Sequence, residues 1–155
     1  MLGGDYTIII SVIDVIRALS ELIEKEYPDY PVVDYDVEED FPRPSYFINV
    51  ENVHTEWVAV DYVQESSDLE ITFFAPNRYE GFLELLDMKN NLTMLFNEPL
   101  QITDTFFVTL LETQSELFKN DKVLTFSFTA NIVNKVERNE TDDYMENLYY
   151  KEEVK

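Results

Sequence analysis

The segment from Lys122 to Val136 alternates apolar and polar side chains more regularly than any other part of the chain. A period of two is typical of a strand with one buried face and one wetter face. The apolar residues that would share the buried face are Leu124, Phe126, Phe128, Ala130 and Ile132. Because such a face must be covered by other elements, we expect an α+β fold, a mainly antiparallel sheet with two amphipathic helices packed on one face.

The first of these helices is predicted from Ile9 to Ile23, where apolar residues recur at helical spacing and charged residues fall on the opposite side. Asp5 or Thr7 can each accept a first-turn N–H, so we expect the helix to begin there. It must end before Pro28, since proline restricts the residue that precedes it.

The second helix is predicted to begin with Asn77 as its N-cap, followed three residues later by Glu80. Two adjacent residues, Asn90 and Asn91, predict a kink or an early stop in its middle. Pro99 ends it. Its expected apolar face is formed by Phe82, Leu85, Leu86, Met88, Leu92, Leu95 and Phe96.

The remaining segments have strand composition. Val32 to Asp40 alternates apolar and acidic residues, which suits a half-exposed strand. Polar links at 51–56 and 65–68 predict hairpin loops between three meander strands, and a turn at 115–121 precedes the strand at Lys122. The meander strands are Ser45–Val50, Trp57–Gln64 and Leu69–Ala75, and one more strand is expected over Thr105–Gln114.

The chain is expected to form one domain over residues 1–136, followed by an acidic, Tyr-containing extension over 137–155. Its 155 residues are enough for one core, and 45% hydrophobic content favours folding despite a net charge of −21. After Val136 the strand pattern stops. We expect no targeting segment and no membrane-spanning segment.

The 32 acidic residues against 11 basic ones indicate that phosphate backbones and anionic membranes are repelled. Specific nucleic-acid binding and membrane binding are therefore not expected. Three roles suit the charge: solubility, repulsion of DNA from a wall that it passes, and attraction of a basic protein. Charge alone does not choose among them.

Residues that could support catalysis or a cofactor are scarce. No Cys is present, which excludes thiolate chemistry, and only 3 Gly argue against Gly-rich phosphate loops. The single histidine, His54, falls in a predicted loop and is interpreted as solvated. The acidic run 34–40 lacks EF-hand spacing. We predict no enzyme, no catalytic residue, no metal and no cofactor.

Candidate interface residues come from three places. Trp57 suits either the core, which is favoured, or a partner-facing anchor. Val33, Tyr35 and Val37 lie on a predicted edge strand that could add to a neighbour's sheet. The third place is the polar extension, which either docks on a partner through its aromatic residues or is a frayed tail. The candidate residues there are Tyr144, Leu148, Tyr149 and Tyr150.

A run from Val37 to Ile48, in which acidic residues precede Phe41-Pro42-Arg43-Pro44 and an aromatic strand, resembles the phage tail terminator family of long-tailed phages and tail-like particles. Residues 69–76 and the strand 125–133 are similar to that family too, as is the order of the elements. The likeness covers about residues 5 to 136.

This resemblance implies a structural virion protein of the tail and neck region, assembled in the host cytoplasm without a cofactor. Its members form a ring, usually a hexamer, that caps the head-proximal end of the tail tube and stops its polymerisation. The implied partners are other copies of the chain, the tail tube protein, a neck or connector protein and the sheath, with DNA passing through the lumen.

Two alternatives stay open from the sequence. One is another head–tail connector or tail-completion subunit, which has the same structural class. The other is an acidic DNA mimic that inhibits a basic host protein, which would use the charge without a ring.

Overall fold

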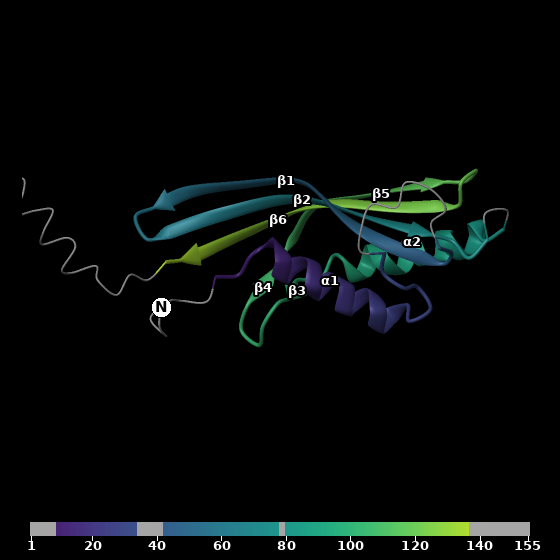
Figure 1. The fold of residues 1–155 in the computed structure, drawn as a ribbon, viewed down its shortest axis with the longest axis horizontal. Coiled ribbons are helices and arrows are strands. Elements are labelled where there is room, and N and C mark those ends of the chain that lie inside the picture. Colours follow the sequence, from purple (N-terminus) through teal and green to yellow (C-terminus); the bar gives the residue numbers. More distant parts are fainter. Residues whose placement is uncertain (1–8, 34–41, 78–79, 137–155) are drawn as a thin grey trace, which may run out of the picture.

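The computed structural model describes residues 9–33, 42–77 and 80–136, which form an α+β fold with both helices on one side of a twisted sheet (Figure 1). The predicted fold class is confirmed. The strands of the main sheet run in the order β1-β2-β6-β5, and every neighbouring pair is antiparallel. The elements are α1 (Val12–Glu26), β1 (Ser45–Ala59), β2 (Tyr62–Phe74), α2 (Phe82–Leu95), β3 (Leu100–Gln101), β4 (Phe107–Val108), β5 (Leu110–Phe118) and β6 (Val123–Lys135).

Strand β6 lies inside the sheet, between β2 and β5. Its alternation is confirmed, because Leu124, Phe126, Phe128, Ala130 and Ile132 are all buried against the helices while the intervening side chains are more exposed. The ring of Phe96, which follows α2, meets the ring of Phe126 edge-on with centroids 5.1 Å apart. The core therefore lies between this face of the sheet and the two helices.

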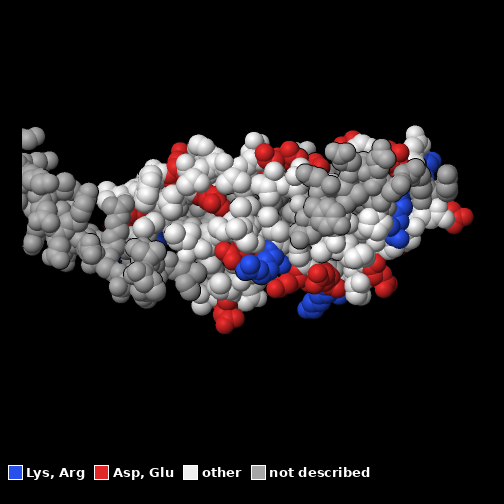
Figure 2. All heavy atoms as spheres, in the orientation of Figure 1, with Lys and Arg blue, Asp and Glu red and all other residues white. Residues whose placement is uncertain are grey.

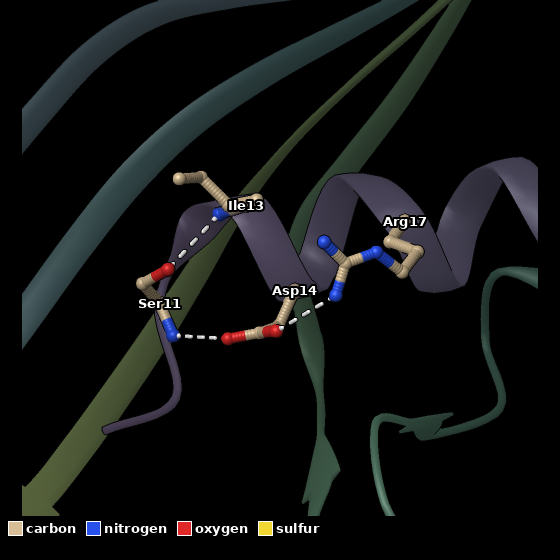
Figure 3. A network of polar contacts seen from close by, with 4 residues as sticks. All are labelled: Ser11, Ile13, Asp14 and Arg17. Carbon is tan, nitrogen blue, oxygen red and sulfur yellow. Dashed lines mark hydrogen bonds and ion pairs between the residues drawn. The ribbon is translucent and has the colours of Figure 1, made fainter. Parts of the chain in front are cut away.

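Helix α1 begins at Val12, so the predicted start near Asp5 or Thr7 is wrong. Ser11 is the N-cap: its hydroxyl accepts the N–H of Ile13 at 3.3 Å, and its own N–H donates to the Asp14 carboxylate at 2.9 Å (Figure 3). A reciprocal cap of this kind satisfies N–H groups that would otherwise lack partners. The helix ends at Glu26, as expected before Pro28.

Helix α2 begins at Phe82 rather than after an Asn77 cap. Gly81 precedes it with φ 100°, a conformation that side chains disfavour, and an added Cβ would lie 3.3 Å from the Ala75 Cβ. The helix does not stop at the two asparagines and continues to Leu95. Its buried face, formed by Leu85, Met88 and Leu92, outweighs the weak propensity of the middle.

The predicted three-stranded meander is wrong, because β1 and β2 form one long hairpin with a two-residue turn at Val60 and Asp61. Both predicted loops, 51–56 and 65–68, are paired strand, with Asn52 opposite Asp68. Every side chain from 51 to 60 is exposed. With no buried face in that part, the strand needs no apolar alternation, which is why the polar residues were interpreted as loops.

The other strand boundaries also differ from prediction. The segment expected as one strand over Thr105–Gln114 is divided into β4 and β5, and β4 pairs with the unpredicted β3. β5 contains a bulge, where Glu112 has φ 54°, and continues to Phe118, so the predicted turn at 115–121 is wrong for its first half. Bulges change the side-chain alternation, and this hides the strand in the sequence.

The strand predicted at Val32–Asp40 is seen only at its start. Val32 forms a parallel bridge with Tyr46, in which the N–H of Val33 donates to the Tyr46 carbonyl at 2.7 Å. Residues 34–41 lie outside the described part. The described start lies along the outer edge of β1.

Candidate functional site

The predicted interface residues are not brought together by the described structure. Val33 is half-buried beside Tyr46 at the start of β1, whereas Trp57 lies near the other end of that strand. Trp57 is 57% exposed, so its favoured placement in the core is wrong. The remaining predicted residues, Tyr35, Val37, Tyr144, Leu148, Tyr149 and Tyr150, lie outside the described residues.

The end of the β1–β2 hairpin, residues 51–62, is an exposed feature of the fold, which we call the distal arm (Figure 1). It combines acidic residues at 51, 56 and 61 with five apolar side chains that are each at least 41% exposed. Exposed apolar residues gathered on one element mark interaction sites more often than scattered ones do. These five are Val53, Trp57, Val58, Val60 and Tyr62.

The distal arm also forms a free sheet edge. β1 is an outermost strand, and only its first residues carry a further segment, residues 31–33, along the outer side. No other described segment pairs with that edge beyond Tyr46. Unpaired N–H and C=O groups along an edge strand can accept a strand from another chain.

The N-terminal end of α1 and the residue Ile10 before it are held beside the arm by two residues that the sequence analysis missed. The Asn134 side chain accepts the N–H of Ile10 at 3.0 Å and donates to its carbonyl at 2.8 Å. The Glu65 carboxylate accepts the N–H of Val12 at 2.7 Å. A sequence signal existed for one of them, because the alternation of β6 places Asn134 on the buried face, where a polar side chain requires a partner.

The face of the sheet opposite the helices is polar and acidic. No Lys or Arg is present among the side chains that β2 and β6 place on this face, which run from Thr72 to Gln64 and from Thr125 to Val133. Across the strands, the Thr129 hydroxyl donates to the Asp68 carboxylate at 2.8 Å. We call this surface the open face.

A hollow of about 310 Å³ on the open face is lined by seven side chains, among them Glu70, Glu116 and Ser127. Partial burial raises the pKa of the Glu70 carboxyl, the nearby charge of Glu51 raises it further, and a hydrogen bond with Ser127 opposes both. The hollow is lined by carboxylates, hydroxyls, one amide and one aromatic ring, with no cation among its lining residues.

The described residues contain no group of three or more His, Asp or Glu side chains arranged to hold a metal ion. His54, predicted in a loop, lies on β1 with its side chain 71% exposed, and its Nε2 is 3.7 Å from a carboxylate oxygen of Glu56. Neither helix seen here has the length and apolar character needed to cross a membrane.

Figure 2 shows Lys and Arg side chains over the lower middle of the molecule and also at the end opposite the distal arm, where the β5–β6 turn lies. The Arg43 guanidinium donates to the carbonyls of Ala75 and Asp121 at 3.2 and 3.1 Å. The Lys119 ammonium lies over the Phe82 ring, 5.4 Å from its centroid, and that of Lys122 donates to the Lys119 carbonyl at 2.6 Å. We call Arg43, Lys119 and Lys122 the basic end.

Comparison with known families gives one match. A family model described as phage tail terminator protein matches residues 14–142, which is more than four-fifths of the chain. No curated protein sequence matches significantly. The matched range contains α1 except its first two residues, the whole of α2, all strands of the main sheet, the distal arm and the basic end. The resemblance carried by residues 37–48 is thereby confirmed, and the chain belongs to the phage tail terminator family.

Proposed function

We propose that this protein forms a ring, of six copies, that caps the head-proximal end of the phage tail tube, stops its polymerisation and joins the tail to the neck. The observation that carries the proposal is the family match over residues 14–142. The family is structural, a component of the phage tail and not an enzyme family. The proposed partners are other copies of the chain, the tail tube protein, a neck or connector protein and, in a contractile tail, the sheath.

The described structure supports assembly in physical terms. Both outer strands of the main sheet, β1 and β5, have long edges, and the distal arm exposes apolar side chains. A ring needs two different patches that meet repeatedly around a closed axis. Surfaces of this kind are costly for a protein that works alone, because they favour association with other chains.

The open face suits a wall past which DNA moves. Its small hydroxyl and amide side chains present hydrogen-bond acceptors, and Asp68, Glu70 and Glu116 add negative charge. Neither the β2 nor the β6 side chains on this face include a cation. Phosphates are repelled from such a surface and do not adhere to it. We propose that this face lines the lumen of the ring.

We divide the proposed roles along the chain. Residues 1–136 form the ring-building domain, and the acidic extension 137–155 contributes Tyr144, Leu148, Tyr149 and Tyr150 to contacts with neighbouring proteins. Val136, the last described residue, donates its N–H to the Asp61 carbonyl at 2.7 Å and so lies beside the tip of the distal arm.

Tube assembly with the tail tube protein tests the proposal. We expect addition of this chain to shorten the tubes, and gold-labelled chains to lie at one end of each tube in electron micrographs, the end next to the head in whole particles. A connector subunit would lie in the neck and leave tube length unchanged. A DNA mimic would bind a basic enzyme as a monomer and ignore tubes, and either result would overturn the capping role.

A further inference from the structure

We infer that the ring contact is heterologous: the distal arm of one copy docks on the basic end of the next copy. This inference rests on the proposed ring and specifies its interface. The partner that binds the distal arm is thus a second copy of this chain, and the charge of the basic end identifies it.

The arm supplies the acidic and apolar half of the contact. From residue 51 to residue 68 the chain has five carboxylates and no Lys or Arg. Val60, at the turn, is 81% exposed, and Trp57 is 57% exposed on the strand before it. Large aromatic residues in this position are typical anchors of protein interfaces.

The basic end supplies the complementary half. The ammonium groups of Lys119 and Lys122 form no ion pair with any described carboxylate, although the chain has 32 acidic residues in all. Phe118, next to them at the end of β5, is 41% exposed. Two cations beside an exposed aromatic ring match an arm that presents carboxylates beside a tryptophan.

The two halves cannot meet within one molecule. Tyr62 begins β2 at the arm and Phe74 ends it beside the β5–β6 turn, since Phe74 pairs with Val123. The twelve residue-to-residue steps from Tyr62 to Phe74 in an extended strand span about 40 Å. Two complementary patches at opposite ends of a rigid sheet join copies head to tail, and that arrangement closes into a ring or continues as a filament.

Contacts between like surfaces are less favourable. Two arms would bring Glu51, Glu56 and Asp61 of both copies together, and Lys135, which pairs with Tyr62, supplies one cation against these three carboxylates. Pairing of the β1 edge with the β5 edge would oppose Glu51 and Glu56 with Glu112 and Glu116. Like charges placed together in an interface favour a different partner, and the basic end is the surface that removes this repulsion.

Charge reversal on both halves tests the contact. The full-length chain is studied by native mass spectrometry and sedimentation over a range of concentrations, alone and with tail tube protein. We expect E51K/E56K and K119E/K122E each to weaken self-association at least about tenfold, since like charges then meet. The control K25E/K89E has the same change in net charge as K119E/K122E but lies on the helices, and should assemble like the unaltered chain.

Mixing gives the sharper result. An equimolar mixture of E51K/E56K and K119E/K122E restores opposite charges at every contact of an alternating ring, so we expect the mixture to assemble where neither variant does. Circular dichroism identifies any double variant that fails to fold. In that case the same mixing experiment is carried out with the single variants E56K and K122E. Unimpaired assembly of both variants, absence of rescue, or a chain that stays monomeric with and without tube protein would each overturn the inference.

The tube assay separates this inference from the proposed function. If tubes are capped by a ring whose assembly ignores all four substitutions, the interface is elsewhere and the capping role stands. If the chain assembles head to tail through the arm but never locates to tube ends, the contact stands and the proposed function fails.

Discussion

Asn134, near the end of the last strand, holds Ile10, just before the first helix, through two hydrogen bonds of 3.0 and 2.8 Å. The two residues are 124 positions apart, and both are buried. The amide side chain satisfies a backbone N–H and a backbone carbonyl at once. Few other contacts in the described structure link the first and last elements so directly.

Replacing Asn134 with Ala should therefore lower the free energy of unfolding by about 2 kcal/mol, because it leaves two buried backbone groups without partners. Urea denaturation measures the change. The control Asn131→Ala alters an exposed residue on the opposite face of the same strand and should cost less than about 0.5 kcal/mol. Equal losses in the two variants would show that the tether contributes nothing of its own.

The Glu65 carboxylate, which accepts the N–H of Val12 at 2.7 Å, acts as a tertiary cap for α1. We expect Glu65→Ala to destabilise the protein by about 1 kcal/mol, the usual cost of a lost helix cap. Glu65→Gln keeps an acceptor oxygen and should lose less than half of that. Thermal unfolding followed by circular dichroism compares the two, and a larger loss in the Gln variant would contradict the capping role.

Glu70 predicts a pH dependence with a definite sign. Its pKa is raised above the ordinary 4.5 by burial and by the charge of Glu51, so between the two pKa values the folded chain retains a proton that the unfolded chain has released. This group's contribution to stability is complete below 4.5 and is lost as the pH rises through the folded pKa.

The difference in unfolding free energy between Glu70→Gln and the unaltered chain isolates that contribution. As the pH rises from about 4 to 7, the unfolding free energy of the Gln variant should increase relative to that of the unaltered chain. Ser127→Ala removes the hydrogen bond that lowers this pKa, and should make the dependence steeper, whereas Glu51→Gln should make it shallower. A flat or opposite difference curve would show that the carboxyl is not perturbed in this direction.

Trp57 provides an optical test of the arm, since it is the only tryptophan in the chain. At 57% exposure its fluorescence should be readily quenched by acrylamide in the unassembled protein, with a quenching constant at least about half that of the urea-unfolded chain. Strong protection in the unassembled protein would contradict the exposed position. On assembly, quenching should fall if the arm is covered.

The sequence predicted those parts of the fold in which one face is buried. β6 and the buried face of α1 follow the two regular periods, because each packs against the same core. The cap at Ser11 was missed because the apolar run before it continues the helical pattern, although Ser11 with Asp14 has the spacing of a capping box.

The candidate site was harder to predict, for a physical reason. The distal arm has both faces in solvent, so nothing in its own fold selects alternation, and Glu51 to Glu56 has the composition of a loop. Its strand character depends on the register with β2. Trp57 was placed in the core by its chemistry alone, whereas its position on the outer strand of the hairpin leaves it 57% exposed.

The Asn134 tether can form only late in translation, after the helix that it holds has emerged. During translation, α1 leaves the ribosome first; Glu65 can cap it once β2 has emerged, whereas the tether to Ile10 forms only after residue 134 has emerged. A chain that stops before residue 134 therefore lacks this tether. The position of the segment before α1, the first helix, thus depends on β6, the last strand of the described fold.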